Sequence, residues 1–284
     1  MPEFATDMTA PEPSFVHPFD SAIALAPAAH AGHFSGATSP VYANMVGPFG
    51  GTTAATLLNA VLQHPERQGE PIALTVNYAS AIEDGGFELV ARAARTNRST
   101  QHWAVELLQG GTVAATATAV LARRRETWSA PDVRPPANLP SPDTLTRAGG
   151  ARRPPWFKRY DMRFVSGGLP EAMDGEEHAS SHSSFWVRDE PARPLDFASL
   201  AAICDCFFPR VFMRRRLFVP IGTVTLTTYF HADAAMLAAQ GERPVLGVAK
   251  ALNFRNGYFD QTAEVWSDSG QLLASTHQMV YYRE

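Results

Sequence analysis

The sequence contains only two cysteines, Cys204 and Cys206, among its 284 residues. Thiols separated by one residue are too close to link distant parts of a fold, which argues against a disulfide scaffold and for a reducing compartment. Neither sign of charge is in large excess, since 24 Lys and Arg stand against 28 Asp and Glu and the formal net charge is -4. This balance gives no general attraction to nucleic acid or to an anionic membrane. We therefore expect a protein that binds neither.

Long hydrophobic runs are also missing, since no stretch approaches the ~18 apolar residues of a membrane-spanning helix. Residues 1–14 carry Glu3, Asp7 and Glu12 and lack the basic and apolar regions of a secretory signal. These absences predict a cytoplasmic protein. The hydrophobic share of 45% is ordinary for a globular chain, so a packed core is expected.

The signatures of several common enzyme classes are absent. The chain has no G-x-S-x-G, G-x-G-x-x-G, G-x-x-x-x-G-K-[ST] or H-E-x-x-H motif, which argues against α/β-hydrolase, Rossmann, P-loop and zincin folds. The pairs His30 with His33 and His178 with His182 fit turn, loop or surface histidines better than metal ligands. We therefore expect neither a metal nor an organic cofactor.

Seven prolines fall between Glu126 and Trp156, mixed with Ser, Asp, Gly and Arg. Proline is excluded from helix interiors and central strands, so this segment predicts a linker. The chain then divides into an N-terminal domain of residues 1–125, a proline-rich linker of residues 126–156 and a C-terminal domain of residues 157–284.

Both domains follow one pattern, a helix followed by four strands. In the first, apolar residues spaced three and four apart predict a helix with one buried stripe over residues 49–64. In the second, Asp196 can cap a helix that extends to about Phe212, with Pro209 ending or kinking it. Runs rich in Val, Leu and aromatic residues, separated by Gly, Asn and Asp turns, predict the strands. These are residues 72–81, 87–95, 101–108 and 113–121, and then 222–231, 244–254, 258–266 and 272–282.

The two domains also share short stretches of sequence, which indicates an internal duplication. Ile72–Thr75 matches Val224–Thr227 at an offset of 152 residues, and Gly111 with the strand after it matches Gly270 at an offset of 159. The second offset places Gln278 on Ala119, so that polar residue belongs to one repeat only. Gln278, Asp205 and Thr223 are polar residues in apolar surroundings. Burying a carboxylate there costs free energy, which makes Asp205 a candidate for a functional role.

These residues and their order resemble the acyl-CoA thioesterases of the double hotdog type, including the type II acyl-CoA thioesterases. The resemblance rests on Phe49-Gly50-Gly51 at the first helix, Leu200–Asp205 on the second, Thr223 eight residues before His231, and the closing Leu272–Gln278. It implies an α+β fold of two tandem hotdog repeats, each an antiparallel sheet wrapped around a central helix. It further implies an acyl-CoA substrate, homo-oligomers and a role in fatty acid metabolism.

The resemblance also assigns roles to individual residues. Asp205, Thr223 and Gln278 match the catalytic residues that orient the attacking water, and Phe49, Gly50 and Gly51 match the substrate-binding start of the first helix. Glycine there lets a substrate approach free backbone N–H groups, which can stabilise an oxyanion. One departure concerns specificity: type II members often carry an acid and a histidine just after the threonine, where this chain has Thr225 and Leu226.

Other interpretations of the same residues stay open. A catalytically silent hotdog protein that binds an acyl-CoA or another apolar ligand would use the same pocket. An enoyl-CoA hydratase or dehydratase would need an acid facing a histidine, for which His231 and His277 are available. The basic run Arg214–Arg216 is either a solvated charge cluster or a site for the phosphates of coenzyme A.

Overall fold

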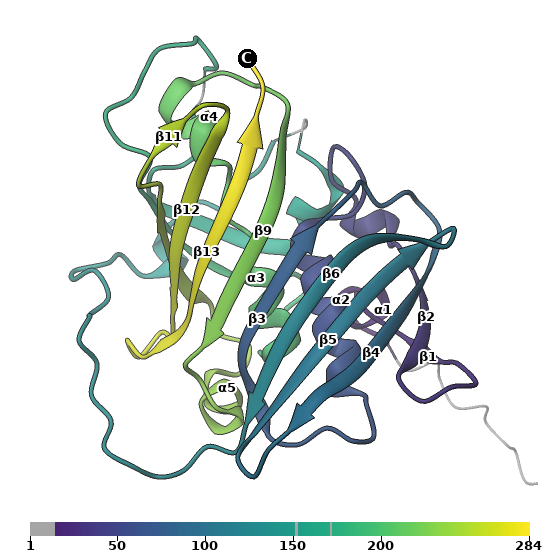
Figure 1. Cartoon of the computed structure of the whole chain (residues 1–284). Coiled ribbons are helices and arrows are strands. Elements are labelled where there is room, and N and C mark those ends of the chain that lie inside the picture. The colour runs from purple at the N-terminus through teal and green to yellow at the C-terminus, as the bar shows by residue number, and fades with distance from the viewer. Residues whose placement is uncertain (1–14, 151–152, 171) are drawn as a thin grey trace, which may run out of the picture.

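The computed structural model describes residues 15–150, 153–170 and 172–284. The segment 1–14, in which no secretory signal is recognised, lies outside the described residues. The chain forms one antiparallel sheet whose strand order is β1-β2-β4-β5-β6-β3-β9-β13-β12-β10-β8-β7, with β11 paired to β12. Figure 1 shows the sheet curving around the central helices, with the N-terminal strands on one side and the C-terminal strands on the other.

The N-terminal repeat contains the predicted helix, α2 (Gly50–Leu62), and all four predicted strands. Two short strands that precede α2 extend the sheet beyond β4. The predicted single buried stripe of the helix is wrong, because residues 51–58, 60 and 61 are all buried. The strands are β1 (Ala26–Pro27), β2 (His33–Ala37), β3 (Glu70–Tyr78), β4 (Gly86–Thr96), β5 (Thr100–Gln109) and β6 (Thr112–Ala122).

The C-terminal repeat contains the predicted strands β9 (Ile221–Phe230), β12 (Tyr258–Trp266) and β13 (Leu272–Tyr282). The predicted strand over residues 244–254 is two strands, β10 (Val245–Lys250) and β11 (Phe254–Arg255). Two further strands, β7 (Tyr160–Ser166) and β8 (Ser183–Asp189), complete this side of the sheet.

The predicted helix from Asp196 to Phe212 is two helices, α3 (Phe197–Ile203) and α4 (Arg210–Arg215). The Asp196 side chain caps α3 by accepting a hydrogen bond from the Ser199 N–H, as predicted. The helix ends earlier than Pro209, however, because the chain turns at Cys204 and Asp205. Asp205 therefore lies just beyond the end of α3.

The two repeats meet where β3 pairs with β9. Thr75 lies opposite Thr227 in this pairing, and their hydroxyl groups are 3.0 Å apart. These residues differ by 152, the offset found in the sequence, so a local pseudo-twofold axis passes between them. The next strand pairs obey the second offset, since Leu74 pairs with Ala119 and Leu226 pairs with Gln278. The structure thus supports the predicted duplication.

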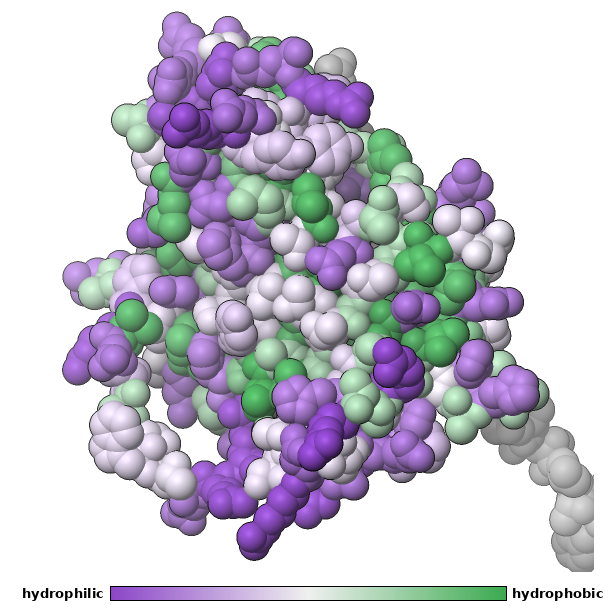
Figure 2. Space-filling model, viewed as in Figure 1, coloured by the Kyte–Doolittle hydropathy of each residue, from purple (hydrophilic) through white to green (hydrophobic). Residues whose placement is uncertain are grey.

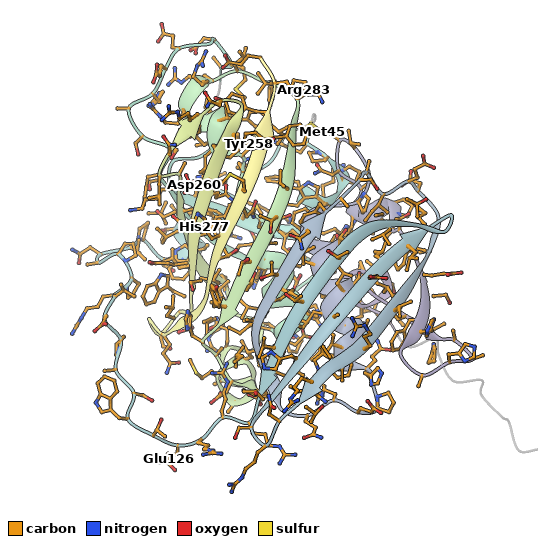
Figure 3. The ribbon with its side chains drawn as sticks, viewed as in Figure 1. Met45, Glu126, Tyr258, Asp260, His277 and Arg283 are labelled. Atoms are coloured by element: carbon orange, nitrogen blue, oxygen red, sulfur yellow. The ribbon has the colours of Figure 1, made fainter. Side chains whose placement is uncertain are left out.

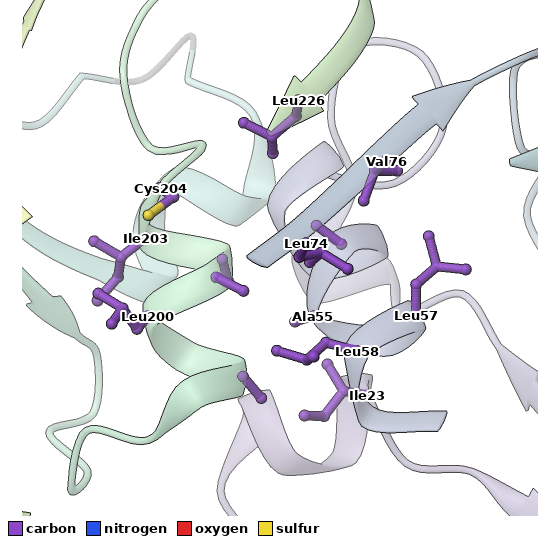
Figure 4. Packing of buried hydrophobic residues seen from close by; sticks show 14 of the residues in the cluster. Ile23, Ala55, Leu57, Leu58, Leu74, Val76, Leu200, Ile203, Cys204 and Leu226 are labelled. Carbon is purple, nitrogen blue, oxygen red and sulfur yellow. The ribbon is translucent and has the colours of Figure 1, made fainter. Parts of the chain in front are cut away.

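The core lies between the sheet and the two central helices, where α2 and α3 pack together (Figure 4). Leu58 and Leu74 from the N-terminal repeat and Leu200 and Leu226 from the C-terminal repeat belong to one buried cluster. Burying a leucine side chain stabilises the fold by about 1.5–3 kcal/mol. The repeats therefore share a continuous core, and a site at their junction has a packed frame.

The remaining short elements lie around this frame. Between β6 and η2 the chain has no helix or strand, and Figure 1 shows this segment standing away from the body. The outer face of the sheet is mostly pale in Figure 2, meaning of intermediate hydropathy, with strongly hydrophilic residues at the edges of the view. The longest helix, α2, has 13 residues, and the described residues include no candidate membrane span. The short elements are α1 (Pro18–Ala22), η1 (Pro40–Tyr42), η2 (Pro142–Thr144), η3 (Pro155–Arg159) and α5 (Ala234–Gln240).

Candidate active site

Asp205 lies at the junction of the two repeats, in the wall of a cavity of about 360 Å³. Its side chain faces this cavity and is otherwise enclosed by protein. The Gln278 amide donates a hydrogen bond of 2.7 Å from Nε2 to Asp205 Oδ1. Since Gln278 is on the inner face of β13, the sheet and the end of α3 together fix the carboxyl group.

Burial raises the pKa of Asp205 from 3.8 to about 7. Loss of hydration disfavours the charged carboxylate, while hydrogen bonds from Gln278 and from the Gly51 backbone N–H stabilise it and keep the pKa from rising further. A carboxyl group with a pKa close to neutral can both accept and release a proton, which is what a general base requires.

The N-terminus of α2 lies directly beside Asp205, and Gly50 forms part of the cavity wall. Gly50 comes so close to the carboxyl group that a Cβ atom there would lie 2.7 Å from Asp205 Oδ2. A Cβ at Gly51 would lie 2.5 Å from the Ala202 carbonyl oxygen and 2.5 Å from the Phe49 ring. Gly51 therefore allows the close approach of α2 to α3, and Gly50 allows the close approach of α2 to the Asp205 carboxyl group.

Phe49, like Gly51, does not line the cavity. It is only 2% exposed, and its ring stacks on Trp156 with the centroids 4.2 Å apart. Gly50 lines the cavity, whereas Phe49 does not. Phe49 thus packs the start of α2 against Trp156, and its ring has almost no exposed surface that a substrate could contact.

Thr223 lines the same cavity as Asp205. It is half-buried near the start of β9 and pairs with Val280 of β13, two residues beyond Gln278. Within the described residues, no hydrogen bond joins Thr223 to Asp205 or Gln278. The structure thus places Asp205 and Thr223 on the wall of one cavity, with Gln278 buried next to Asp205 and hydrogen-bonded to it.

Tyr78 is a residue of the site that the sequence analysis missed. It lies at the end of β3, lines the cavity, and donates a hydrogen bond of 2.8 Å from its hydroxyl to the Gly50 carbonyl oxygen. Burial and the nearby Asp205 carboxylate raise the pKa of Tyr78 well above 10, so its hydroxyl keeps its proton and remains a donor. Tyr78 thereby fixes the first peptide group of α2.

The repeat offsets relate Tyr78 and the predicted catalytic residues to their counterparts in the other repeat. At 152 residues, Tyr78 corresponds to Phe230 and Thr223 corresponds to Pro71, while at 159 residues Gln278 corresponds to Ala119. In each of these three pairs, the residue of the site has a polar side chain and its counterpart does not.

The histidines considered for a dehydratase do not line this cavity. His231 Nε2 lies 2.9 Å from the Ser275 hydroxyl, and His277 Nε2 lies 3.2 Å from Asp260 Oδ2. His277, which is labelled in Figure 3, is exposed on β13, and because side chains alternate along a strand, the buried Gln278 lies on the opposite face. Across the described ranges, no three His, Cys, Asp or Glu side chains come together in a way that could hold a metal ion.

Comparison with solved structures defines the class of fold. A protein of unknown function with a hot dog fold from Alicyclobacillus acidocaldarius is 46% identical, with a TM-score of 0.90 over 95% of this chain and 99% of that chain. The acyl-CoA thioesterase II TesB2 from Mycobacterium marinum is 17% identical, with a TM-score of 0.71 over 93% of this chain and 98% of that one. The predicted α+β fold of two tandem hotdog repeats is thus confirmed.

The family follows from the sequence match. The model described as acyl-CoA thioesterase N-terminal domain matches residues 39–122, and the model described as acyl-CoA thioesterase C-terminal domain matches residues 131–282. The chain belongs to this acyl-CoA thioesterase family, as the resemblance indicated. A search of curated proteins finds no match.

Proposed function

We propose that the protein hydrolyses an acyl-CoA thioester to the free carboxylic acid and coenzyme A. The observation that carries this proposal is the Asp205 carboxyl group, which is held by Gln278 and faces a cavity at the N-terminus of α2. Family membership supports the substrate class. The reaction as proposed requires neither a metal nor an organic cofactor.

The proposed mechanism begins with a water molecule beside Asp205. The carboxylate accepts a proton as the water oxygen attacks the thioester carbonyl carbon. Gln278 holds the carboxylate in position, and the Thr223 hydroxyl, on the cavity wall, orients the water or the thioester. The carbon–sulfur bond then breaks, and the thiolate leaves with little need for an acid because the pKa of a thiol is near ~8.5.

Negative charge develops on the carbonyl oxygen during this attack, and the start of α2 is suited to stabilise it. The first N–H groups of a helix have no partner within the helix. Gly51 N–H is directed at Asp205, whereas Gly50 N–H has no acceptor among the described residues. We assign Gly50 N–H as an oxyanion donor, a type of interaction that contributes about 3–4 kcal/mol to transition-state stabilisation.

The first test is thiol release from acyl-CoA substrates of increasing chain length. We expect saturable release with the wild-type protein. A smaller cavity, of about 20 Å³, adjoins the Asp205 cavity and shares the wall residues Pro48, Thr53 and Ile82 with it. Because that space holds about one water molecule, the panel should include two- to four-carbon acyl groups. Ligand binding without thiol release at any chain length would contradict the hydrolase and favour the silent binding protein.

The pH dependence of the reaction provides a second prediction. Since the base must be ionised, kcat/KM should rise with pH through an apparent pKa of about 7 and level off above it. Replacing Gln278 with Met removes the donor that lowers this pKa, so the profile should move to higher pH. We expect a loss of about tenfold at pH 6.5 and a smaller loss at pH 9. An unchanged profile would show that Gln278 does not act through Asp205.

A further inference from the structure

A second hollow lies beside the catalytic cavity, where β13 ends. Its volume is about 350 Å³, and it is lined by residues 256–258 and 281–283. Tyr258 and Tyr281 are paired across β12 and β13 and are 50% and 37% exposed. Directly paired residues in antiparallel strands project from the same face, so two aromatic side chains stand together in solvent. Figure 3 labels Tyr258, and Arg283 near it, at this end of the sheet.

Arg283 adds a positive charge to these aromatic rings. Its guanidinium carbon lies 5.9 Å from the centre of the Tyr281 ring. Within the described ranges, no carboxylate forms an ion pair with Arg283, whereas Arg214, Arg215 and Arg216 pair with Glu177, Glu284 and Asp174. The carboxylates thus already neutralise the charges of the basic run Arg214–Arg216, whereas the charge of Arg283 at the hollow stays available to an anionic ligand.

The hollow adjoins the catalytic cavity, because Tyr281 lines both. Tyr281 lies opposite Gly222 of β9, and a Cβ at Gly222 would come within 2.4 Å of the tyrosine ring. The ring therefore lies directly against the Gly222 backbone, at the wall of the catalytic cavity. A ligand that extends outward from Asp205 reaches the Tyr281 ring as it leaves the cavity.

The backbone around the hollow is held in place by hydrogen bonds. Tyr282 N–H donates to the Gly257 carbonyl oxygen at 2.8 Å, and Arg283 N–H donates to the Pro220 carbonyl oxygen at 3.0 Å. The turn before β12, the end of β13 and the residue before β9 are thereby joined. The backbone that carries the two tyrosines and the arginine is therefore preformed, which lowers the entropic cost of binding a ligand there.

We propose that Tyr258, Tyr281 and Arg283 bind the nucleotide end of the coenzyme A thioester. Aromatic side chains stack on nucleobases, and an arginine guanidinium forms paired hydrogen bonds with phosphate. The acyl end occupies the Asp205 cavity while the nucleotide lies outside on this aromatic and basic surface. The inference rests on the proposed function, and it makes coenzyme A, rather than any other thiol carrier, the preferred leaving group.

The test compares acyl-CoA with the matching acyl-pantetheine, which has the same thioester and lacks the nucleotide. For the wild type we expect kcat/KM to be at least tenfold higher with acyl-CoA. In Arg283→Ala and in Tyr281→Ala this ratio should fall about tenfold, mainly through KM. The matched controls are Arg92→Ala on β4 and Tyr229→Ala on β9, which remove exposed side chains distant from the hollow and should keep the wild-type ratio. A ratio near one in the wild type, or one that Arg283→Ala leaves unchanged, would overturn the proposal.

Direct binding separates this inference from the proposed hydrolysis. Adenosine 3′,5′-bisphosphate, a fragment of the nucleotide end, should bind the wild-type protein in a calorimetric titration and bind Arg283→Ala at least tenfold more weakly. That result supports the nucleotide site even if no thioester is hydrolysed, in which case the proposed function alone fails. Equal affinity of the two proteins for the bisphosphate would exclude the site even if thioesters are hydrolysed.

Discussion

Replacing Asp205 with Asn should lower kcat for acyl-CoA hydrolysis about 10³-fold and change substrate affinity little. The side chain keeps its size and can still accept the hydrogen bond from Gln278, but it can no longer accept a proton from water. General base catalysis contributes typically ~10²–10⁴-fold. Because the residue acts on the water rather than on the ligand, the loss should appear in kcat. Thiol release and direct titration of the substrate measure the two quantities separately.

Asp189 offers a matched control for this experiment. It also has a pKa raised by burial to about 7, and it accepts a hydrogen bond of 2.5 Å from the Ser199 hydroxyl of α3. It is 3% exposed and does not line the Asp205 cavity. Asp189→Asn should therefore keep kcat within a few fold of the wild type. Equal losses in the two variants would mean that the core, and not the base, was damaged, while retention of activity by Asp205→Asn would remove Asp205 from the mechanism.

At high pH the Asp205→Asn variant should be more stable than the wild-type protein. This difference provides a check that the variant is folded. The pKa of Asp205 is about 7 in the folded protein and near 3.8 in the unfolded chain. Between these values the folded protein retains a proton that the unfolded chain has lost, so the free energy of unfolding decreases as pH rises. The variant lacks this titration. Its unfolding temperature should exceed that of the wild type at pH 8, and the difference should shrink toward pH 4.

The local sequence predicted the elements whose patterns are regular. The limits of β12 and β13 were predicted to the residue, and those of α2 to within two residues, because alternation and helical spacing are clear there. The early end of α3 was missed because the turn at Asp205 depends on contacts with α2 and β13, which no local rule contains. Strands β7 and β8 were missed because all seven residues of β8 except Arg188 are buried, so no polar–apolar alternation marks the strand.

Only part of the candidate site was predicted from the sequence, because the rest depends on contacts between the two repeats. Asp205, Thr223 and Gln278 lie in the C-terminal repeat, and the resemblance found them by their short surrounding motifs. Tyr78 comes from the N-terminal repeat and reaches Gly50 only because β3 pairs with β9 at the junction. To predict a site that both repeats form, one must know how the two repeats pair. The offset of 152 residues already encoded that pairing, but only the structure showed what it brings together.

Gly50→Ala should lower turnover about 10²-fold and leave stability nearly unchanged or slightly higher. The added methyl carbon would lie 2.7 Å from Asp205 Oδ2 and 3.4 Å from the Tyr78 hydroxyl oxygen. The carboxyl group is a side chain and can move away, so the strain is relieved at the expense of its position. Alanine is also favoured over glycine within a helix by up to ~1 kcal/mol. We therefore expect the turnover to fall while the unfolding temperature stays the same or rises slightly.

The adjacent glycine should respond in the reverse manner, which makes Gly51→Ala the informative comparison. Its added methyl carbon would lie 2.5 Å from the Ala202 carbonyl oxygen and 2.5 Å from the buried Phe49 ring. A backbone atom and a packed ring cannot move as readily as a carboxyl group beside a cavity, so we expect a loss of about 1–3 kcal/mol in the free energy of unfolding. Gly86→Ala, with no atom closer than 3.8 Å to the added carbon, should affect neither property. Full activity in Gly50→Ala would show that the close approach of α2 to Asp205 serves packing alone.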